Sequence, residues 1–419
     1  MWTGPTGELT YSGLRVVELA DELRGEIVGK LLADEGADVV KVEPSGGSIG
    51  RHIGPHAEGF EHDPNASLYF WTYNTGKRSV VIEVDETSGR QRFDELVAAA
   101  DVLITSDGPG RLGERGIDLD AYLVRHPALI VLSVSPYGLT GPWADRRTSE
   151  LVGLAAGGPL LSCGYDDHTI PPILPGGNQA SQIAASFGHT GLLLALLERQ
   201  SSGLGQMIDV SMHEAIAVSG ELANPYWFYP RVHLHRQTCR HAQPSPTQPA
   251  LFECADGVDV YFALILSDTK TWQTLVEWLD TLGLALDLAD EAYLSLAHRQ
   301  QNFAHIQDIM ESFFLMQESA DVYRGAQDRG LPLGPILAPE QLLDDPHLQA
   351  REFFVPVELP TQGEALFPSS PYRFSYGNGR PGRPPKLGED NGFDFNDSSA
   401  ESQVAAHDAA HASTGVGLV

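Results

Sequence analysis

Residues 176–214 read GGNQASQIAASFGHTGLLLALLERQSSGLGQMIDVSMHE, and this stretch decides how the rest of the chain is organised. Its central part, residues 183–197, is too apolar for a surface helix, so we expect a helix in the core. Asn178 precedes the first turn, which is the position of a capping residue. Gly203 and Gly205 predict the end of the helix and a turn into a further short element.

Short apolar runs alternate with helical patterns in the first third of the chain. We expect strands at residues 14–19, 38–43, 80–84, 101–105 and 129–135, and helices at residues 26–35, 88–100 and 118–125. Strands that alternate with helices are typical of βαβ units, so the sequence predicts an α/β fold with a parallel sheet. Residues 20–25, after the first strand, read ADELRG instead of GxGxxG, so no dinucleotide-binding turn is predicted.

Proline-rich segments divide the chain into predicted domains. Residues 1–224 are expected to form the first part of a large domain, and residues 225–250 a crossing. A small domain follows at residues 251–330, and residues 331–385 make a second crossing and return to the large domain. Residues 386–419 are polar and rich in small residues, so we expect a mobile tail.

The chain is strongly acidic. Its 419 residues include 27 Lys and Arg against 56 Asp and Glu, which gives a net charge of −29. This charge argues against nucleic acid and membrane surfaces as partners, and an anionic ligand needs a local cationic site. The cysteines form no CxxC pair, the N-terminal segment is polar, and no apolar run reaches about 18 residues, so we expect a cytoplasmic protein.

Three segments could carry chemistry, and each also has a simpler interpretation. Residues 74–79, NTGKRS, place two cations before a strand and could hold phosphates or form a solvated turn. Residues 133–138, SVSPYG, could flank a ligand or be an ordinary strand end. Residues 233–241 contain three histidines and a cysteine, but their irregular spacing and the arginines among them argue against a metal site.

Six segments follow one another in a characteristic order along the chain. They are GLRVVEL at residues 13–19, LLADEGADVVKVEP at 31–44, NTGKRS at 74–79, ADVLI at 100–104, SVSPYGLTGP at 133–142 and GLGQMIDVSMHE at 203–214. Together they resemble the family III CoA-transferases, a group that includes formyl-CoA and carnitine CoA-transferases and α-methylacyl-CoA racemase. The resemblance covers about residues 13–375.

This resemblance implies a Rossmann-like large domain built from the N- and C-terminal parts, with an inserted smaller α/β domain. It also implies an interlocked dimer, either a homodimer or a heterodimer with a family III homologue. The implied substrates are an acyl-CoA, which carries coenzyme A, and a small carboxylic acid, and no metal is implied. The residues that match the family's CoA-binding loops are Lys41, Arg51, Asn74, Lys77, Arg78, Ser106, Ser135 and Tyr137.

The expected catalytic position departs from the family pattern. In these transferases an aspartate ahead of the central helix attacks the acyl-CoA thioester. Here Asn178 and Gln179 follow the glycine pair, and an alignment of the central helix without a gap places Ser181 at the position of the aspartate. An amide cannot make this attack, because its nitrogen lone pair is delocalised. The alternatives are CoA transfer at a variant site, a catalytically silent CoA-binding subunit, and an acyl-CoA racemase.

Two further side chains are candidates for acid–base chemistry near this position. His189 lies about 12 Å along the helix from Ser181, which is too far for a hydrogen bond, so we expect no serine ester. Glu150 precedes an apolar run, and we interpret it as a carboxylate in the first turn of a helix. A racemase would need both as a proton-transferring pair.

Overall fold

The computed structural model describes residues 9–220, 223–262, 268–375 and 377–397. Within these residues the chain forms two compact units. The first unit combines residues 9–158, 175–220, 349–375 and 377–397, and the second combines residues 159–174, 223–262 and 268–348. The segments of the two units therefore alternate along the sequence, and residues 175–220 of the first unit lie between the two segments of the second.

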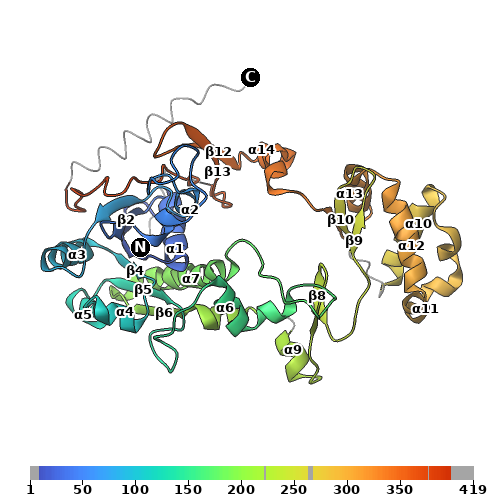
Figure 1. Ribbon diagram of the computed structural model, residues 1–419, viewed down its shortest axis with the longest axis horizontal. Helices are drawn as coiled ribbons and strands as arrows, with labels where there is room; N and C mark the ends of the chain where they lie inside the picture. The colour runs from blue at the N-terminus through green and yellow to red at the C-terminus, as the bar shows by residue number, and fades with distance from the viewer. Residues whose placement is uncertain (1–8, 221–222, 263–267, 376, 398–419) are drawn as a thin grey trace. The chain divides into compact units, whose positions relative to one another are not determined.

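The first unit contains a parallel sheet, which confirms the predicted α/β fold (Figure 1). Over the described residues it has six strands in the order β3-β2-β1-β4-β5-β6, and each neighbouring pair is parallel. The strands are β1 Arg15–Leu19, β2 Asp38–Glu43, β3 Arg78–Val81, β4 Val102–Thr105, β5 Ile130–Ser135 and β6 Met207–Ser211. The order reverses between β1 and β4, and the crevice at the carboxyl ends of such strands is the usual ligand site.

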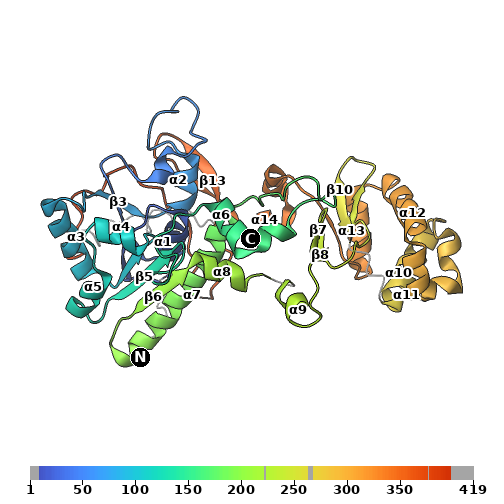
Figure 2. The ribbon, with the colours of Figure 1, turned by 60° about the horizontal axis from the view of Figure 1, so that its bottom comes forward.

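Helices cover both faces of this sheet (Figures 1 and 2). Helix α1 packs against helix α7, and both contact β5. Phe93 of α3 and Tyr122 of α5 pack with Val131 on the opposite face, because successive side chains of a strand alternate. The helices are α1 Leu23–Asp34, α2 Leu68–Tyr73, α3 Thr87–Ala99, α4 Pro109–Glu114, α5 Leu119–Arg125, α6 Glu150–Gly157, α7 Gln179–Ser202 and α8 Met212–Val218.

Helix α7 is buried on one face only, so its predicted burial in the core is partly wrong. The buried face is made largely of small residues, and a Cβ on Gly188 would lie 3.0 Å from Val134 Cγ2. These small residues let α7 approach β5 closely. Phe187, Leu194 and Leu197 are exposed. By length and composition α7 could also cross a membrane, but this is weak evidence, since the core helix of a soluble protein passes the same test.

The end of α7 and the entry into β6 are as predicted. Gly203 adopts a left-handed conformation with a φ of +74°, and its N–H group donates to the Arg199 carbonyl at 2.8 Å. The Gly205 N–H donates to the Pro127 carbonyl at 2.7 Å. A Cβ on Gly205 would lie 1.8 Å from the Leu129 carbonyl oxygen, so no larger residue fits without a backbone shift.

The second unit, taken by itself, combines a small antiparallel sheet with helices. The sheet has the order β11-β10-β9, and Phe252, Trp272 and Phe313 belong to its core. Residues 225–250, expected to be an irregular crossing, contain part of α9 and a two-stranded hairpin, β7–β8. The elements are α9 Ala223–Phe228, β7 His235–Gln237, β8 Arg240–Gln243, β9 Leu251–Glu253, β10 Asp259–Phe262, α10 Thr269–Thr281, α11 Leu296–Gln301, α12 Phe303–Leu315, α13 Ser319–Asp328 and β11 Leu333–Pro335. Helix α14, Pro346–Ala350, spans the boundary at which the chain returns to the first unit.

The C-terminal segment of the first unit packs on elements from the N-terminal part of the sequence. Strands β12 (Phe354–Glu358) and β13 (Glu364–Pro368) form an antiparallel hairpin that packs on α2. The prediction of a mobile tail is wrong for residues 386–397. Asp390 accepts a hydrogen bond from the Ser79 N–H at 2.9 Å, and Phe393 is buried. The rest of the predicted tail, residues 398–419, lies outside the described residues.

Candidate functional site

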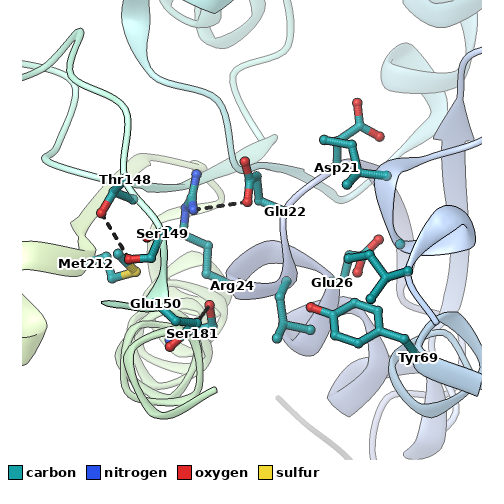
Figure 3. Close-up of a pocket in the computed structure, with 14 residues that line it drawn as sticks. Asp21, Glu22, Arg24, Glu26, Tyr69, Thr148, Ser149, Glu150, Ser181 and Met212 are labelled. Carbon is teal, nitrogen blue, oxygen red and sulfur yellow. Dashed lines mark hydrogen bonds and ion pairs between the residues drawn. The ribbon is translucent and has the colours of Figure 1, made fainter. Parts of the chain in front are cut away.

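A pocket of about 210 Å³ lies in the first unit, where the carboxyl end of β1 meets the first turn of α1. We call it the β1 pocket. Its lining includes Asp21, Glu22, Arg24, Glu26, Tyr69, Glu150 and Ser181 (Figure 3). These residues come from the loop after β1, from α1 and α2, and from the N-terminal ends of α6 and α7. The pocket therefore occupies the part of the sheet where ligands usually bind.

Arg24 fixes one wall of the β1 pocket. Its guanidinium is buried and donates to the carbonyl oxygens of Val134 and Ser106, both at 2.8 Å. The Nη1 atom lies 3.6 Å from Glu22 Oε2, which is an ion pair without a close hydrogen bond. Burial raises the pKa of Glu22, although Arg24 opposes this shift. Arg24 thus links α1 to the ends of β4 and β5, and part of its guanidinium faces the pocket.

A buried charge network lies behind the opposite wall. Lys41 Nζ is 2.9 Å from Glu26 Oε1 and 3.1 Å from Glu18 Oε1, and Lys77 Nζ is 2.8 Å from Glu18 Oε2. Lys77 also donates to Asn74 Oδ1 at 2.9 Å. Burial alone lowers the pKa of Lys41, but the carboxylates of Glu26 and Glu18 raise it above its ordinary value. The structure therefore brings together three of the residues predicted to contact CoA, with their polar groups already paired.

The other predicted CoA-binding residues lie apart from this network. Arg51 is fully buried and donates to both carboxylate oxygens of Glu43 at 2.7 Å. Burial alone raises the pKa of Glu43, but these Arg51 hydrogen bonds lower it to about 2. Arg78 Nε lies 2.7 Å from Asp38 Oδ1, and its guanidinium covers the ring of Phe393.

Ser106, Ser135 and Tyr137 lie at the carboxyl ends of β4 and β5. The two serines are fully buried, and the Ser106 hydroxyl accepts a hydrogen bond from the Glu22 N–H at 3.3 Å. Tyr137 packs against Trp143 and His213 at centroid distances of 5.6 and 5.5 Å. This aromatic cluster was not predicted, because its members are separated in the sequence.

Glu150 reaches from α6 to the N-terminal end of α7. Its Oε2 atom accepts from the Ala180 N–H at 2.9 Å, and its Oε1 atom accepts from the Ser181 N–H at 3.1 Å. The Ser181 hydroxyl also donates to Oε1. Glu150 is in the first turn of α6, as predicted, but it also caps α7. This second contact was not predicted, because sequence spacing could not reveal a contact between residues that are 30 positions apart.

The two residues predicted at the catalytic position lie outside the lining of the β1 pocket. Asn178 has a φ of +52° and makes no capping hydrogen bond with its side chain. Its amide instead donates to the Tyr73 hydroxyl at 3.3 Å. Gln179 is exposed and donates to the Gly176 carbonyl at 3.1 Å. Ser181 does line the pocket, next to Glu150.

His189 is hydrogen bonded to the Tyr11 hydroxyl at 3.0 Å and does not line the pocket, so it makes no acid–base pair there with Glu150. Burial lowers the pKa of His189. Among the described residues, no group of three or more His, Cys, Asp and Glu side chains could hold a metal ion. The lining of the pocket offers carboxylates, hydroxyls and a guanidinium for chemistry.

Comparisons with known proteins agree on one family. Residues 11–391 match the profile of CoA-transferase family III. The chain is 30% identical over 389 residues to the succinyl-CoA:(R)-benzylsuccinate CoA-transferase subunit BbsE of Thauera aromatica, covering 90% of this chain and 92% of that protein. It is 29% identical over 395 residues to the succinate–glutarate CoA-transferase of Agrobacterium fabrum, covering 92% and 94%.

A solved structure supports the same assignment. The crystal structure of a CaiB/BaiF family protein from Brucella suis has a TM-score of 0.78 and 26% identity, covering 95% of this chain and 100% of that chain. The fold and the sequence match over nearly the whole chain lead to one conclusion. The chain belongs to CoA-transferase family III.

Proposed function

We propose that the chain transfers CoA between an acyl-CoA donor and a small carboxylic acid, at a variant site without the usual aspartate. The observation that carries this proposal is that the β1 pocket extends to the N-terminal end of α7. The catalytic position of the resemblance, Asn178 to Ser181, lies at this helix end. Glu150 supplies a carboxylate there, although Asn178 does not.

The thioester end of acyl-CoA is proposed to enter the β1 pocket. Lys41, Arg51 and Lys77 are buried and paired with carboxylates, so they do not fit as direct phosphate contacts. Their proposed role is to hold the loops that surround CoA. Arg146 and Arg147 are exposed and lie just before the Thr148–Glu150 wall of the pocket. We assign the phosphates to these two arginines, since guanidinium groups suit phosphate.

Arg24 is proposed to bind the carboxylate of the acceptor acid. Two of its N–H groups are used by Val134 and Ser106, and the Nη1 group facing Glu22 has only the 3.6 Å contact. A guanidinium can hold a carboxylate through two parallel hydrogen bonds. The Glu22 side chain is 49% exposed and can move aside as the acid binds.

A second function is a CoA-binding subunit that is silent by itself. The amide at Asn178 favours it, because an amide cannot attack a thioester. Subunit BbsE of Thauera aromatica and the alpha subunit of the succinyl-CoA–L-malate CoA-transferase of Chloroflexus aurantiacus are named as subunits. In this case the chain would form an interlocked heterodimer with a homologue that carries the aspartate.

Calorimetry followed by an activity assay tests these proposals. We expect saturable binding of CoA and succinyl-CoA to the isolated chain. Chromatography should then detect new acyl-CoA when succinyl-CoA is mixed with a panel of small carboxylic acids. Absence of CoA binding would contradict both functions. Binding without transfer, followed by transfer on addition of an aspartate-bearing homologue, would support the silent subunit instead.

A further inference from the structure

We propose that Glu150 is the carboxylate that carries the acyl group and then CoA, in place of the aspartate that is missing at Asn178. This inference rests on the proposed CoA-transferase function. Glu150 lines the β1 pocket and lies within hydrogen-bond distance of α7. The carboxylate thus reaches the end of the central helix from α6, rather than from α7 itself.

The two oxygens of Glu150 have different surroundings. Oε1 accepts from both the N–H and the hydroxyl of Ser181, whereas Oε2 accepts from the Ala180 N–H at 2.9 Å. A carboxylate oxygen offers about two lone-pair sites. The described contacts therefore leave one lone pair of Oε2 for attack, while Oε1 stays held by two donors.

The donors around Oε1 suit the chemistry of an acylated Glu150. Once Oε2 has formed a bond, Oε1 becomes a carbonyl oxygen. Attack on that carbonyl places negative charge on Oε1, where the N–H and hydroxyl of Ser181 already point. Preorganised donors of this kind stabilise tetrahedral intermediates strongly. The contact that fixes the side chain in the free protein therefore also serves as an oxyanion site.

The other carboxylates of the pocket lack this arrangement. Glu26 is held in an ion pair with buried Lys41, and Glu22 faces Arg24. Asp21 has one buried oxygen without a hydrogen-bond partner. Among the described pocket carboxylates, Glu150 is the one that accepts two backbone N–H groups. The geometry thus distinguishes it from its neighbours.

The reaction balances without any further reactant. Oε2 attacks the thioester carbonyl of acyl-CoA, which forms a glutamyl–acyl anhydride and releases CoA thiolate. The thiolate attacks the Glu150 carbonyl, which gives a glutamyl-CoA thioester and the free donor acid. The acceptor carboxylate attacks this thioester and forms a second anhydride with release of thiolate. The thiolate then attacks the acceptor carbonyl, which yields the new acyl-CoA and regenerates Glu150.

Covalent trapping tests the assignment. The full chain is incubated with succinyl-CoA, treated with borohydride or hydroxylamine, digested with trypsin and sequenced by tandem mass spectrometry. We expect the modification on Glu150, within the peptide of residues 148–199. The parent is compared with Glu150→Gln and with Glu198→Gln, an exposed carboxylate of the same peptide. The modification should disappear in Glu150→Gln and persist in Glu198→Gln.

A second variant keeps the test informative if Glu150→Gln fails to fold. Ser181→Ala retains the carboxylate and both N–H donors but removes one oxyanion donor. We expect its turnover to fall by roughly 10²–10³-fold, with trapping still on Glu150. Trapping on another residue, or CoA binding without a trapped Glu150, would overturn the inference and leave the proposed function standing. Absence of CoA binding would overturn both.

Discussion

Replacement of Lys41 by methionine tests the charge network behind the β1 pocket. The Lys41 side chain has no exposed surface, and it donates to Glu18, to Glu26 and to the Ala20 carbonyl at 2.6 Å. Methionine keeps a similar shape but leaves two buried carboxylates without this cation. Removal of one partner from a buried ion pair costs about 3–5 kcal/mol, mainly because the remaining charge is uncompensated.

This loss should be visible in thermal unfolding followed by circular dichroism. Each kcal/mol of lost folding free energy lowers Tm by about 2–4 °C in a domain of this size, so we expect Lys41→Met to lower Tm by about 6–20 °C. Arg111→Met is the control, because Arg111 and Glu114 form a pair on the surface, where such pairs contribute little. The double variant Lys41→Met, Glu26→Gln should recover part of the loss. A shift no larger than that of Arg111→Met would refute the account of a coupled network.

Three other substitutions test separate parts of the account. Arg24→Met should raise the KM for the acceptor acid by roughly 10–100-fold, since one charge-assisted contact contributes about 1.5–3 kcal/mol. The affinity for CoA, measured by calorimetry, should not change, and equal effects on both ligands would contradict the role of Arg24 in binding the acid. Glu43→Gln should lower Tm near pH 7, because the pKa of Glu43 is held at about 2 by Arg51. A lowered carboxyl pKa stabilises the folded state at pH values above the pKa of the unfolded chain, about 4.3, and this stabilisation is lost as pH falls toward the folded pKa of about 2. The difference in Tm between the parent and Glu43→Gln should therefore shrink as pH is lowered from about 4.3 toward 2. Gly205→Ala should destabilise the chain by about 1–3 kcal/mol through its clash with the Leu129 carbonyl, whereas Gly46→Ala, which meets nothing within 4 Å, should change Tm little.

The parallel sheet could be predicted from the sequence because its signals are local. The strand predicted at residues 38–43 coincides with β2, and the helix predicted at residues 88–100 is displaced by one residue from α3. The turn at Gly203 could be predicted in the same way, because the left-handed backbone conformation at the end of a helix favours glycine. Such features depend on neighbours in the chain, which the sequence displays directly.

The site was less predictable because it depends on contacts between distant segments. The cations of residues 74–79 suggested phosphate contacts, but Lys77 is buried against Glu18. Asn178 occupies the expected N-cap position, yet the carboxylate that satisfies the end of α7 comes from Glu150. The spacing of residues in the sequence does not predict a contact between two helices of this kind. The burial of a cation likewise depends on its tertiary partners, which no local pattern specifies.

Transfer of ¹⁸O from the acceptor acid to the protein tests the central claim most directly. An acceptor labelled in both carboxylate oxygens attacks the glutamyl-CoA thioester, and one labelled oxygen stays on the enzyme when CoA leaves with the acceptor. After turnover with succinyl-CoA, tandem mass spectrometry of residues 148–199 should place ¹⁸O on Glu150 and none on Asp166 or Glu198. Transfer of CoA with ¹⁸O on a different residue, or with no ¹⁸O on Glu150, would contradict the account.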